Sequence, residues 1–496
     1  MFRYPFLFLL SLLLSCQSSQ TTSFLIENVK IADGSGQAMY EGAVRIDGGK
    51  IIAQGNLRSL PGEKRIDGEG KVLAPGFIDT HSHHSDAIFE QPQAEKLLSQ
   101  GITSIVVGLD GFSHYPINNW LSKIDSIPIA VNMGSFVGHN TLRDMAMQDY
   151  TRTADQTEIA FMDSILKKEL AAGALGMSSG LEYDPGIYAE PSEIQLLAKT
   201  LKKNNSRYSS HLRSEDRQLW NAVDEIIELG RTSGIPVNIS HIKLAMVNLW
   251  GRADSLVQKL DRARTEGINI TADIYPYEYW QSTMTVLFPE RNFDDLQAYE
   301  FALTALTRPE YMIIANYEAE PTFVGKTLEE IAALRGEDPV QTYRYLIKTA
   351  LAQDAGESII CKSMTEEDIA ILLQWPFTNI CTDGSFESLH PRGTGSFPRI
   401  LRRFVRERQD LYAEEAIRKM SSLAAANTGI KYRGQIAPDF WADLVLFDPD
   451  GIADHADFNN PDSLSSGVSK VWVNGALVWD GKPTGIFPGQ AISSKP

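Results

Sequence analysis

Residues 74–84 read APGFIDTHSHH. This apolar run contains the turn signals Pro75 and Gly76 and ends in a His-x-His pair, His81 and His83. Side chains at positions i and i+2 of a β-strand point to the same face, so both imidazoles can contact one metal ion. Neutral imidazole is the commonest protein ligand of zinc-like metals. Taken alone, the pair fits a polar strand edge equally well, and the rest of the chain decides between the two interpretations.

Strand-like and helical segments alternate between about residues 75 and 434. Apolar runs at residues 101–108 and 127–131 are typical of buried parallel strands, and residues 158–172 and 221–233 have a helical pattern. This alternation predicts a (β/α)₈ barrel of the α/β class. A doubly wound open sheet is the alternative, but no glycine-rich nucleotide fingerprint follows an early strand.

The sequence pattern at both ends of the globular region differs from the strand–helix alternation of the middle. Residues 24–73 and 435–490 contain short strand-like runs with tight-turn signals such as Asp47-Gly48-Gly49 and Asn474-Gly475. We therefore expect the two ends to form one small β-sandwich domain beside a barrel of residues 74–434. Residues 284–351 fit the barrel pattern poorly and are predicted to be an insertion or lid.

The first residues have the pattern of a targeting segment. Arg3 precedes an apolar run at residues 6–14 that is too short to span a bilayer. The sequence LLSC at residues 13–16 resembles a bacterial lipobox, so residues 1–15 are predicted to be a lipoprotein signal peptide and Cys16 the lipidated residue. Residues 16–23 would form a tether, and the protein would be lipid-anchored in the cell envelope, facing the periplasm. The alternative is an ordinary cleaved signal peptide with a coincidental cysteine.

The net charge bears on which partners the protein binds, and the positions of the cysteines bear on whether they form a disulfide. The chain has 46 Lys and Arg against 63 Asp and Glu, a net charge of −17, which argues against nucleic acid as a partner. The membrane would be a partner only through the lipid anchor. Cys361 and Cys381 each lie in a short apolar run, which favours buried free thiols over a disulfide.

Polar residues recur where the predicted strands end. Besides the first histidine pair, Asp110, His211, His241 and Asp383 each follow a strand-like run. Functional residues of such barrels gather at the carboxyl ends of the strands. A structural role is the simpler interpretation of any one of these residues, but their recurrence at successive strand ends predicts a metal centre.

These segments resemble the amidohydrolase superfamily and, within it, the D-aminoacylases, which are N-acyl-D-amino-acid deacylases. The resemblance runs from about Ile26 to the C-terminus. It implies a barrel with a small β-sandwich domain, a zinc centre of one or two ions in which another divalent metal could substitute, and a small-molecule substrate. The segments that carry it, beyond the histidines, are GMSSGLEY (176–183), HLRSE (211–215), ISHIKLA (239–245), DIYPY (273–277) and HPRGTGSFPR (390–399).

The resemblance also implies a division of the metal ligands. His211, His241 and Asp110 would hold a tightly bound ion. A second, weaker site would consist of His81, His83 and Asp383.

One position departs from the family pattern. In these deacylases the second strand typically ends in Gly-Asn-Cys-Gly, and the cysteine bridges the metals, whereas residues 108–111 here read GLDG. Asp110 can offer one carboxylate oxygen to each ion, which replaces a soft ligand with a hard one. The alternative is that Asp110 only caps the following helix.

Amide hydrolysis needs a strong nucleophile, a polarised carbonyl and a proton for the leaving amine. The resemblance assigns the proton transfer to Asp383. Arg392 offers a planar fork for a substrate α-carboxylate, and Lys243 can assist it. Tyr183 could face the scissile carbonyl, and Tyr277 could add a hydroxyl donor. For each of these residues the alternative is a surface cation or a core aromatic.

The predicted function is metal-dependent hydrolysis of N-acyl-D-amino acids, or of peptides with a C-terminal D-residue. One alternative is a cyclic-amide hydrolase of the same superfamily, against which a free-carboxylate clamp at Arg392 argues. The other is a non-catalytic envelope binding protein, which the loss of a metal ligand would favour.

Overall fold

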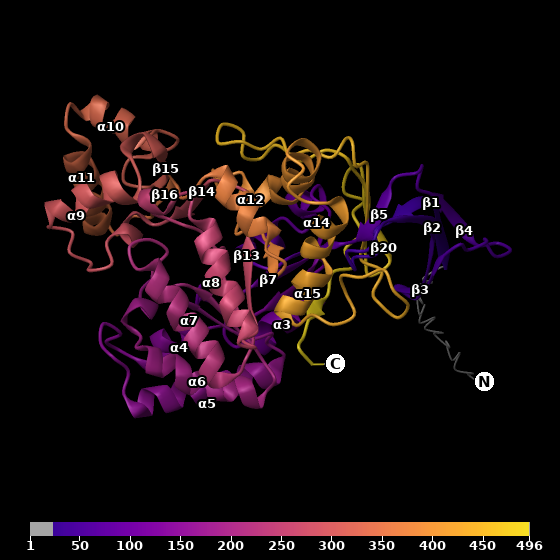
Figure 1. The fold of residues 1–496 in the computed structure, drawn as a ribbon, viewed down its shortest axis with the longest axis horizontal. Coiled ribbons are helices and arrows are strands. Elements are labelled where there is room, and N and C mark those ends of the chain that lie inside the picture. The colour runs from indigo at the N-terminus through magenta and orange to yellow at the C-terminus, as the bar shows by residue number, and fades with distance from the viewer. Residues whose placement is uncertain (1–22, 496) are drawn as a thin grey trace, which may run out of the picture.

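The computed structural model describes residues 23–495, and its centre consists of parallel strands (Figure 1). One six-stranded sheet has the order β17-β13-β12-β11-β10-β9, and a four-stranded sheet has the order β21-β8-β7-β6. The strands are β6 (Phe77–Asp79), β7 (Ile102–Val107), β8 (Asn132–Ser135), β9 (Val137–Gly138), β10 (Met177–Gly180), β11 (Tyr208–His211), β12 (Val237–Ile239), β13 (Ile270–Ile274), β17 (Thr378–Ile380) and β21 (Ala491–Ile492).

The two sheets are joined at both edges. At one edge, β8 and β9 are separated by the single residue Phe136. At the other edge, an isolated parallel bridge links Ser82, after β6, to Gly384, after β17. The ladders therefore make two joined parallel sheets rather than one uninterrupted ring. This agrees with the parallel α/β class that the sequence predicted and brings the carboxyl ends of β6 and β17 together.

Helices follow most of the parallel strands and lie outside the sheets (Figure 1). Helix α5 begins at a capping box between Asp155 and Glu158 and ends at Gly173, which has a positive φ of 120°. The main helices of this layer are α3 (Ile117–Ser126), α4 (His139–Ala146), α5 (Gln156–Ala172), α6 (Pro191–Lys203), α7 (Leu219–Ser233), α8 (Ala253–Thr265), α12 (Glu366–Gln374), α14 (Ala413–Met420) and α15 (Ser422–Thr428).

The strand predicted at residues 127–131 is wrong, because β8 begins only at Asn132. The backbone hydrogen bonds of the predicted segment go to other parts of the chain. Ala130 donates its N–H to the Pro92 carbonyl, and the Ile129 carbonyl accepts from Gly489. An apolar run is therefore buried here without taking part in a ladder.

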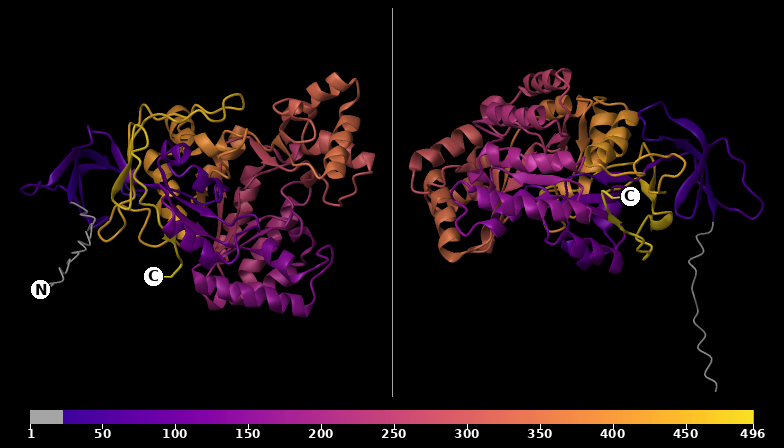
Figure 2. Two further views of the ribbon diagram at one scale, coloured as in Figure 1. Left: turned by 180° about the vertical axis from the view of Figure 1, so that it is seen from behind. Right: turned by 90° about the horizontal axis from the view of Figure 1, so that it is seen from below.

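The two ends of the described chain pair in one mixed sheet of eight strands. Its order is β20-β19-β18-β5-β1-β2-β3, with β4 beside β1. The antiparallel pairing of β18 with β5, for example Leu446 opposite Leu73, joins the ends. The indigo and yellow segments accordingly lie side by side in Figure 2. The strands are β1 (Phe24–Ile31), β2 (Tyr40–Asp47), β3 (Lys50–Gly55), β4 (Lys64–Asp67), β5 (Val72–Pro75), β18 (Leu444–Phe447), β19 (Val468–Val473) and β20 (Ala476–Asp480).

A separate lobe is inserted between β13 and β17. It has its own core, in which Tyr299 and Tyr343 pack around Phe288. The lobe and strands β1–β4 lie at opposite ends of the long axis of the molecule (Figures 1 and 2). Its elements are β14 (Tyr279–Ser282), α9 (Leu296–Phe301), β15 (Met312–Tyr317), α10 (Leu328–Arg335), α11 (Pro339–Gln353) and β16 (Glu357–Lys362), with the order β14-β16-β15 in its sheet.

Two further sequence predictions concern the targeting segment and the cysteines. The predicted signal peptide, Cys16 and nearly all of the tether lie outside the described residues. Within residues 23–495, no helix is long and apolar enough to cross a membrane. Cys361 and Cys381 are both free and buried.

Candidate metal centre

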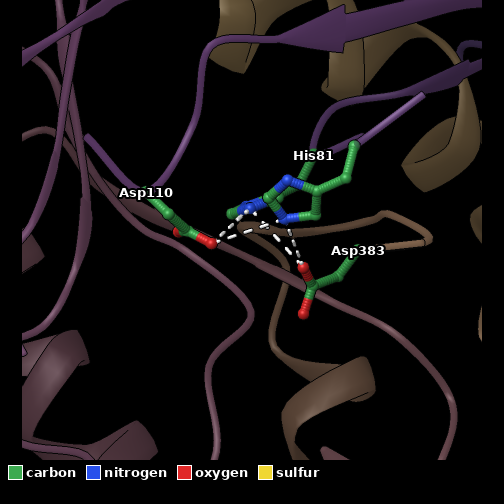
Figure 3. Close-up of side chains that lie close together, drawn as sticks. His81, Asp110 and Asp383 are labelled. Atoms are coloured by element: carbon green, nitrogen blue, oxygen red, sulfur yellow. Dashed lines mark hydrogen bonds and ion pairs between the residues drawn. The ribbon is translucent and has the colours of Figure 1, made fainter. Parts of the chain in front are cut away.

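The six predicted metal ligands come together at the carboxyl ends of the parallel strands. Their ligand atoms form two groups, and within each group the atoms lie within 4.8 Å of one another. Figure 3 shows His81 and Asp383 facing Asp110 across the centre of the site. The first group is His81, His83, Asp110 and Asp383, and the second is Asp110, His211 and His241.

Asp110 belongs to both groups, and each of its carboxylate oxygens faces a different histidine pair. Oδ1 lies 3.1 Å from Nε2 of His241. Oδ2 lies 3.3 Å from Nε2 of His81 and 3.5 Å from Nε2 of His83. Nε2 of His241 is in turn 3.1 Å from Nδ1 of His211. The carboxylate therefore lies between the two halves of the site, where a bridging ligand would have to be.

Three of these residues have a left-handed backbone. The φ angles are 53° at Asp110, 37° at His241 and 49° at Asp383. This conformation costs a non-glycine residue about 1–3 kcal/mol, and it gathers at functional sites where the surrounding structure enforces it. Here it turns each strand end so that the side chain points into the site.

The electrostatics of the site favour a bound cation. Burial lowers the pKa of an imidazole, yet nearby carboxylates, chiefly Asp110, raise the pKa of His81 well above its usual value. The same carboxylate and Glu215 raise the pKa of His241 to about 9, against burial and the neighbouring Lys243. Neither ring nitrogen of His81 has a hydrogen-bond partner, although both are buried. Imidazole nitrogens and carboxylate oxygens are the donors that zinc accepts, so these residues fit such an ion.

Two glutamates complete the His211–His241 half, and the sequence did not predict a role for either. Nε2 of His211 lies 3.0 Å from Oε2 of Glu182, and Nδ1 of His241 lies 3.0 Å from Oε1 of Glu215. Each imidazole thus turns one nitrogen to the Asp110 side and the other to a carboxylate, an arrangement that fixes the tautomer of a metal-bound histidine. Both glutamates occur within segments of the family resemblance, four residues after His211 and one before Tyr183.

A buried aspartate contacts residues of both halves of the site. Asp273, in β13, accepts hydrogen bonds of 2.7 Å from the His241 N–H and from Nδ2 of Asn238. Its Oδ1 also lies 3.7 Å from Nδ1 of His81. One carboxylate therefore supports residues of both histidine pairs from behind.

The two predicted substrate-binding cations are both engaged by protein carboxylates. Nζ of Lys243 lies 2.7 Å from each carboxylate oxygen of Glu215. Nη1 of Arg392, the first residue of helix α13 (Arg392–Arg399), donates to Oδ2 of Asp383 at 2.5 Å. Burial raises the pKa of Asp383, but Arg392 and the histidines outweigh burial and hold that pKa well below its usual value. Nε of Arg392 is buried without a partner, so the guanidinium retains donor capacity.

The structure brings one of the two predicted tyrosines to the site. Tyr183 lines the cavity, with its ring centroid 4.3 Å from that of His211 and its hydroxyl 3.5 Å from Oγ of Ser282. Tyr277 is not among the residues lining the cavity, and the Arg399 guanidinium lies over its ring at 4.7 Å. Tyr275 lies nearer the site, because the Arg392 guanidinium is 4.8 Å from its ring centroid.

A cavity of about 390 Å³ opens over both groups of ligands. Trp280, Val286 and Leu287 form its apolar wall. Arg291, close in sequence to this wall, does not line the cavity, because it donates to the Glu182 carbonyl and to Asp184. The cavity therefore joins a carboxylate-rich metal site to a small apolar surface.

Comparison with known proteins finds relatives among the amidohydrolases and the deacylases of D-amino acids. The amidohydrolase family model matches residues 317–479. The N-acyl-D-glutamate deacylase of Alcaligenes xylosoxydans xylosoxydans is 33% identical, and the match covers 94% of this chain and 96% of the relative. The D-aminoacylase of the same organism is 31% identical, covering 97% of this chain and 99% of the relative.

Solved structures agree with these sequence matches. The N-acyl-D-glutamate deacylase of Bordetella bronchiseptica, solved with zinc and a phosphonate mimic of the tetrahedral intermediate, has a TM-score of 0.86 and 32% identity over 95% of this chain and 99% of its own. A D-aminoacylase structure has a TM-score of 0.85 and 30% identity over the same shares. The L-hydantoinase of Arthrobacter aurescens, at 13% identity and a TM-score of 0.58 over 95% of this chain and 99% of its own, shares the fold alone.

Proposed function

The chain belongs to the amidohydrolase family, among the N-acyl-D-amino-acid deacylases, and from this premise we propose that it hydrolyses N-acyl-D-amino acids, or peptides with a C-terminal D-residue, with the help of zinc. It is a hydrolase of linear amide C–N bonds. The observation that carries the proposal is the Asp110 carboxylate between two histidine pairs, in a cavity that also contains Arg392.

The proposal assigns the metal ligands as follows. His211, His241 and Asp110 would hold one ion, and Asp110 would also contribute to a second site with His81, His83 and Asp383. The relatives support this choice of metal, since one was solved with zinc and the D-aminoacylase is described as having a binuclear metal centre. A bound zinc ion lowers the pKa of water and polarises a carbonyl.

Asp383 is the proposed proton carrier. One of its oxygens faces the histidines, with Oδ1 at 3.0 Å from Nε2 of His83, while the other is held by Arg392. The carboxylate can accept the proton that the attacking water loses as its oxygen bonds to the carbonyl carbon. It then returns that proton to the amide nitrogen as the C–N bond breaks, so the products are a carboxylic acid and a free D-amino acid.

Arg392 is the proposed clamp for the α-carboxylate of the substrate. Its link to Asp383 uses Nη1, and the remaining N–H groups of the guanidinium can donate to a second carboxylate. Lys243 lines the same cavity and adds positive charge beside the site. Tyr183 can face the scissile carbonyl from the His211 side.

Hydrolysis of cyclic amides is the alternative within the superfamily. The hydantoinases share only the fold with this chain. The hydantoin ring also lacks the free α-carboxylate that Arg392 is suited to bind. A linear N-acyl-amino acid therefore supplies a partner for Arg392 that a hydantoin does not.

The experiment that tests the proposal compares substrate classes directly. Metal-stripped protein, with and without added zinc, is assayed against N-acetyl-D-amino acids, their L-enantiomers and hydantoins. We expect zinc-dependent turnover of the D-enantiomers. Turnover of hydantoins without turnover of any N-acetyl-D-amino acid would support the alternative.

The cellular location is proposed from the sequence. The LLSC segment at residues 13–16 supports a lipid anchor at Cys16 and a place in the bacterial envelope. Metabolic labelling with a palmitate analogue should mark the wild-type protein and leave Cys16→Ser unlabelled. Equal labelling of both would rule out Cys16 as the anchor.

A further inference from the structure

A second and larger cavity adjoins the one over the metal ligands. Its volume is about 1010 Å³, and it shares three lining residues with the inner cavity: Gln281, Ser358 and Ser388. We call this second cavity the outer groove. The two cavities therefore adjoin at these three side chains, which alone among the described residues belong to both linings.

The shared side chains are polar and only partly buried. Oγ of Ser388 donates to Oε1 of Gln281 at 2.6 Å, and Nε2 of Gln281 lies 3.5 Å from Oγ of Ser358. Hydroxyl and amide groups of this kind can exchange their mutual hydrogen bonds for bonds to a ligand at little net cost. The passage is therefore suited to a chain that itself carries N–H and C=O groups.

The outer groove lies between segments that are distant in sequence. Residues 90–96, at helices α1 (Ala87–Glu90) and α2 (Glu95–Leu98), form one wall, and β15 and β16 of the inserted lobe form another. Residues 461–464 close a third side. Amide side chains lie along these walls at Gln91, Gln93 and Asn316, beside apolar residues such as Phe386 and Leu389. A peptide presents both amide groups and side chains, so this mixed lining suits a peptide better than a purely apolar acyl chain.

Strand β14 adds a backbone surface to the passage. In the described chain it pairs with β16 along one edge and with no strand along the other. Three of its residues, Trp280, Gln281 and Ser282, line the inner cavity. An open strand edge can pair with an extended peptide backbone.

The charged residues of the outer groove indicate which net charge its ligand should have. The outer groove is lined by Glu90, Glu95, Glu387 and Asp462, and within residues 23–495 only Asp462 of these four forms an ion pair, with Lys96. Negative charge accumulates along the groove as a result. A neutral or basic chain should therefore be preferred to an acidic one.

We propose that the outer groove binds the peptide that precedes a C-terminal D-residue, so that the substrate class is peptidyl-D-amino acids rather than short N-acyl-D-amino acids. This inference rests on the proposed function. The scissile amide would lie over the metal ligands, the terminal carboxylate at Arg392, and the peptide chain would run past Gln281 and Ser388 into the groove.

The test compares acetyl-D-alanine with acetyl-Ala-Ala-D-alanine in the zinc-loaded protein. We expect kcat/KM to be about tenfold higher for the peptide, which is what one or two additional hydrogen bonds give. Asn316→Trp fills the outer groove from β15 and should remove this advantage while leaving acetyl-D-alanine unaffected. Glu329→Trp places the same bulk on an exposed position of α10, away from the groove, and should change neither substrate.

The outcomes separate the two proposals. Equal kcat/KM for both substrates, with Asn316→Trp affecting neither, overturns the peptide subsite and leaves the deacylase function intact. If Asn316→Trp instead impairs N-acetyl-D-lysine and spares the peptide, the groove binds the D side chain, which also overturns the inference. Failure to hydrolyse any D-substrate overturns the proposed function and the inference with it.

Discussion

The two histidine pairs of the site are built differently. His211 and His241 are each 2% exposed, and the second ring nitrogen of each meets a glutamate. In the other pair His81 is fully buried, whereas the His83 side chain is 41% exposed and its Nε2 contacts Asp110 and Asp383, the latter also bound by Arg392. We call His211 and His241 the enclosed pair, and the side of the site formed by His83, Asp383 and Arg392 the open side. We infer that the enclosed pair retains an ion and that the open side takes part in turnover.

Removing one histidine from each pair gives the strongest test of whether the two pairs have different roles. His241→Ala should lower kcat by about 10⁴-fold, because several kcal/mol of charge stabilisation are lost with the ion. His83→Ala should retain the first ion and cost far less. Zinc content measured with turnover in both variants checks this, and equal losses of zinc and activity would erase the distinction between the pairs.

Asp383 tests whether the open side carries the proton transfer. Asp383→Asn keeps the shape of the side chain and removes its basicity, so hydrolysis of N-acetyl-D-amino acids should fall by about 10³-fold. The ion held by His211 and His241 should remain, as should the thermal unfolding midpoint of the fold. Retained turnover would exclude Asp383 as the proton carrier.

Arg392 tests what the open side binds. Arg392→Ala removes charged hydrogen bonds to the substrate carboxylate, and kcat/KM for free acids should fall by about 10²-fold, mainly through KM. The matching measurement uses the amide of the same substrate, which lacks the carboxylate. The variant should have similar kcat/KM values for the acid and the amide. An undiminished preference for the acid would show that another residue binds the substrate carboxylate.

The smallest predicted effect is on zinc affinity and comes from Glu182, whose carboxyl group contacts a ring nitrogen of His211. Glu182→Gln should weaken zinc binding by about tenfold, because an amide replaces the carboxyl group that orients His211. Asp216→Asn is the matched control, since Asp216 lines the same cavity but bonds to Ser214 and not to a histidine. Competition with a chromogenic chelator measures both, and equal affinities would remove Glu182 from this role.

The sequence was informative where one strand end supplies one functional residue. His211 and His241 each end a predicted strand, so their convergence follows from the parallel arrangement alone. The same reasoning brought Asp110 and Asp383 to the site. None of this requires knowledge of side-chain packing.

What the sequence did not predict depends on local turns and on partners distant in the chain. Strand β13 ends at Ile274 and the chain bends at Pro276, so Tyr277 packs under the Arg399 guanidinium instead of lining the cavity. Glu182 and Glu215 meet histidines on other strands or in a turn, and no spacing in the sequence indicates such pairings. The apolar run at residues 127–131 is buried by loop contacts rather than by a ladder.

The most direct test of the central claim is to titrate zinc into metal-free protein while bound zinc and hydrolysis of an N-acetyl-D-amino acid are measured together. We predict that activity rises in step with the first ion bound, and that His241→Ala abolishes this first binding event while His83→Ala does not. Full activity before any zinc is bound, or loss of the first ion in His83→Ala alone, would contradict the account.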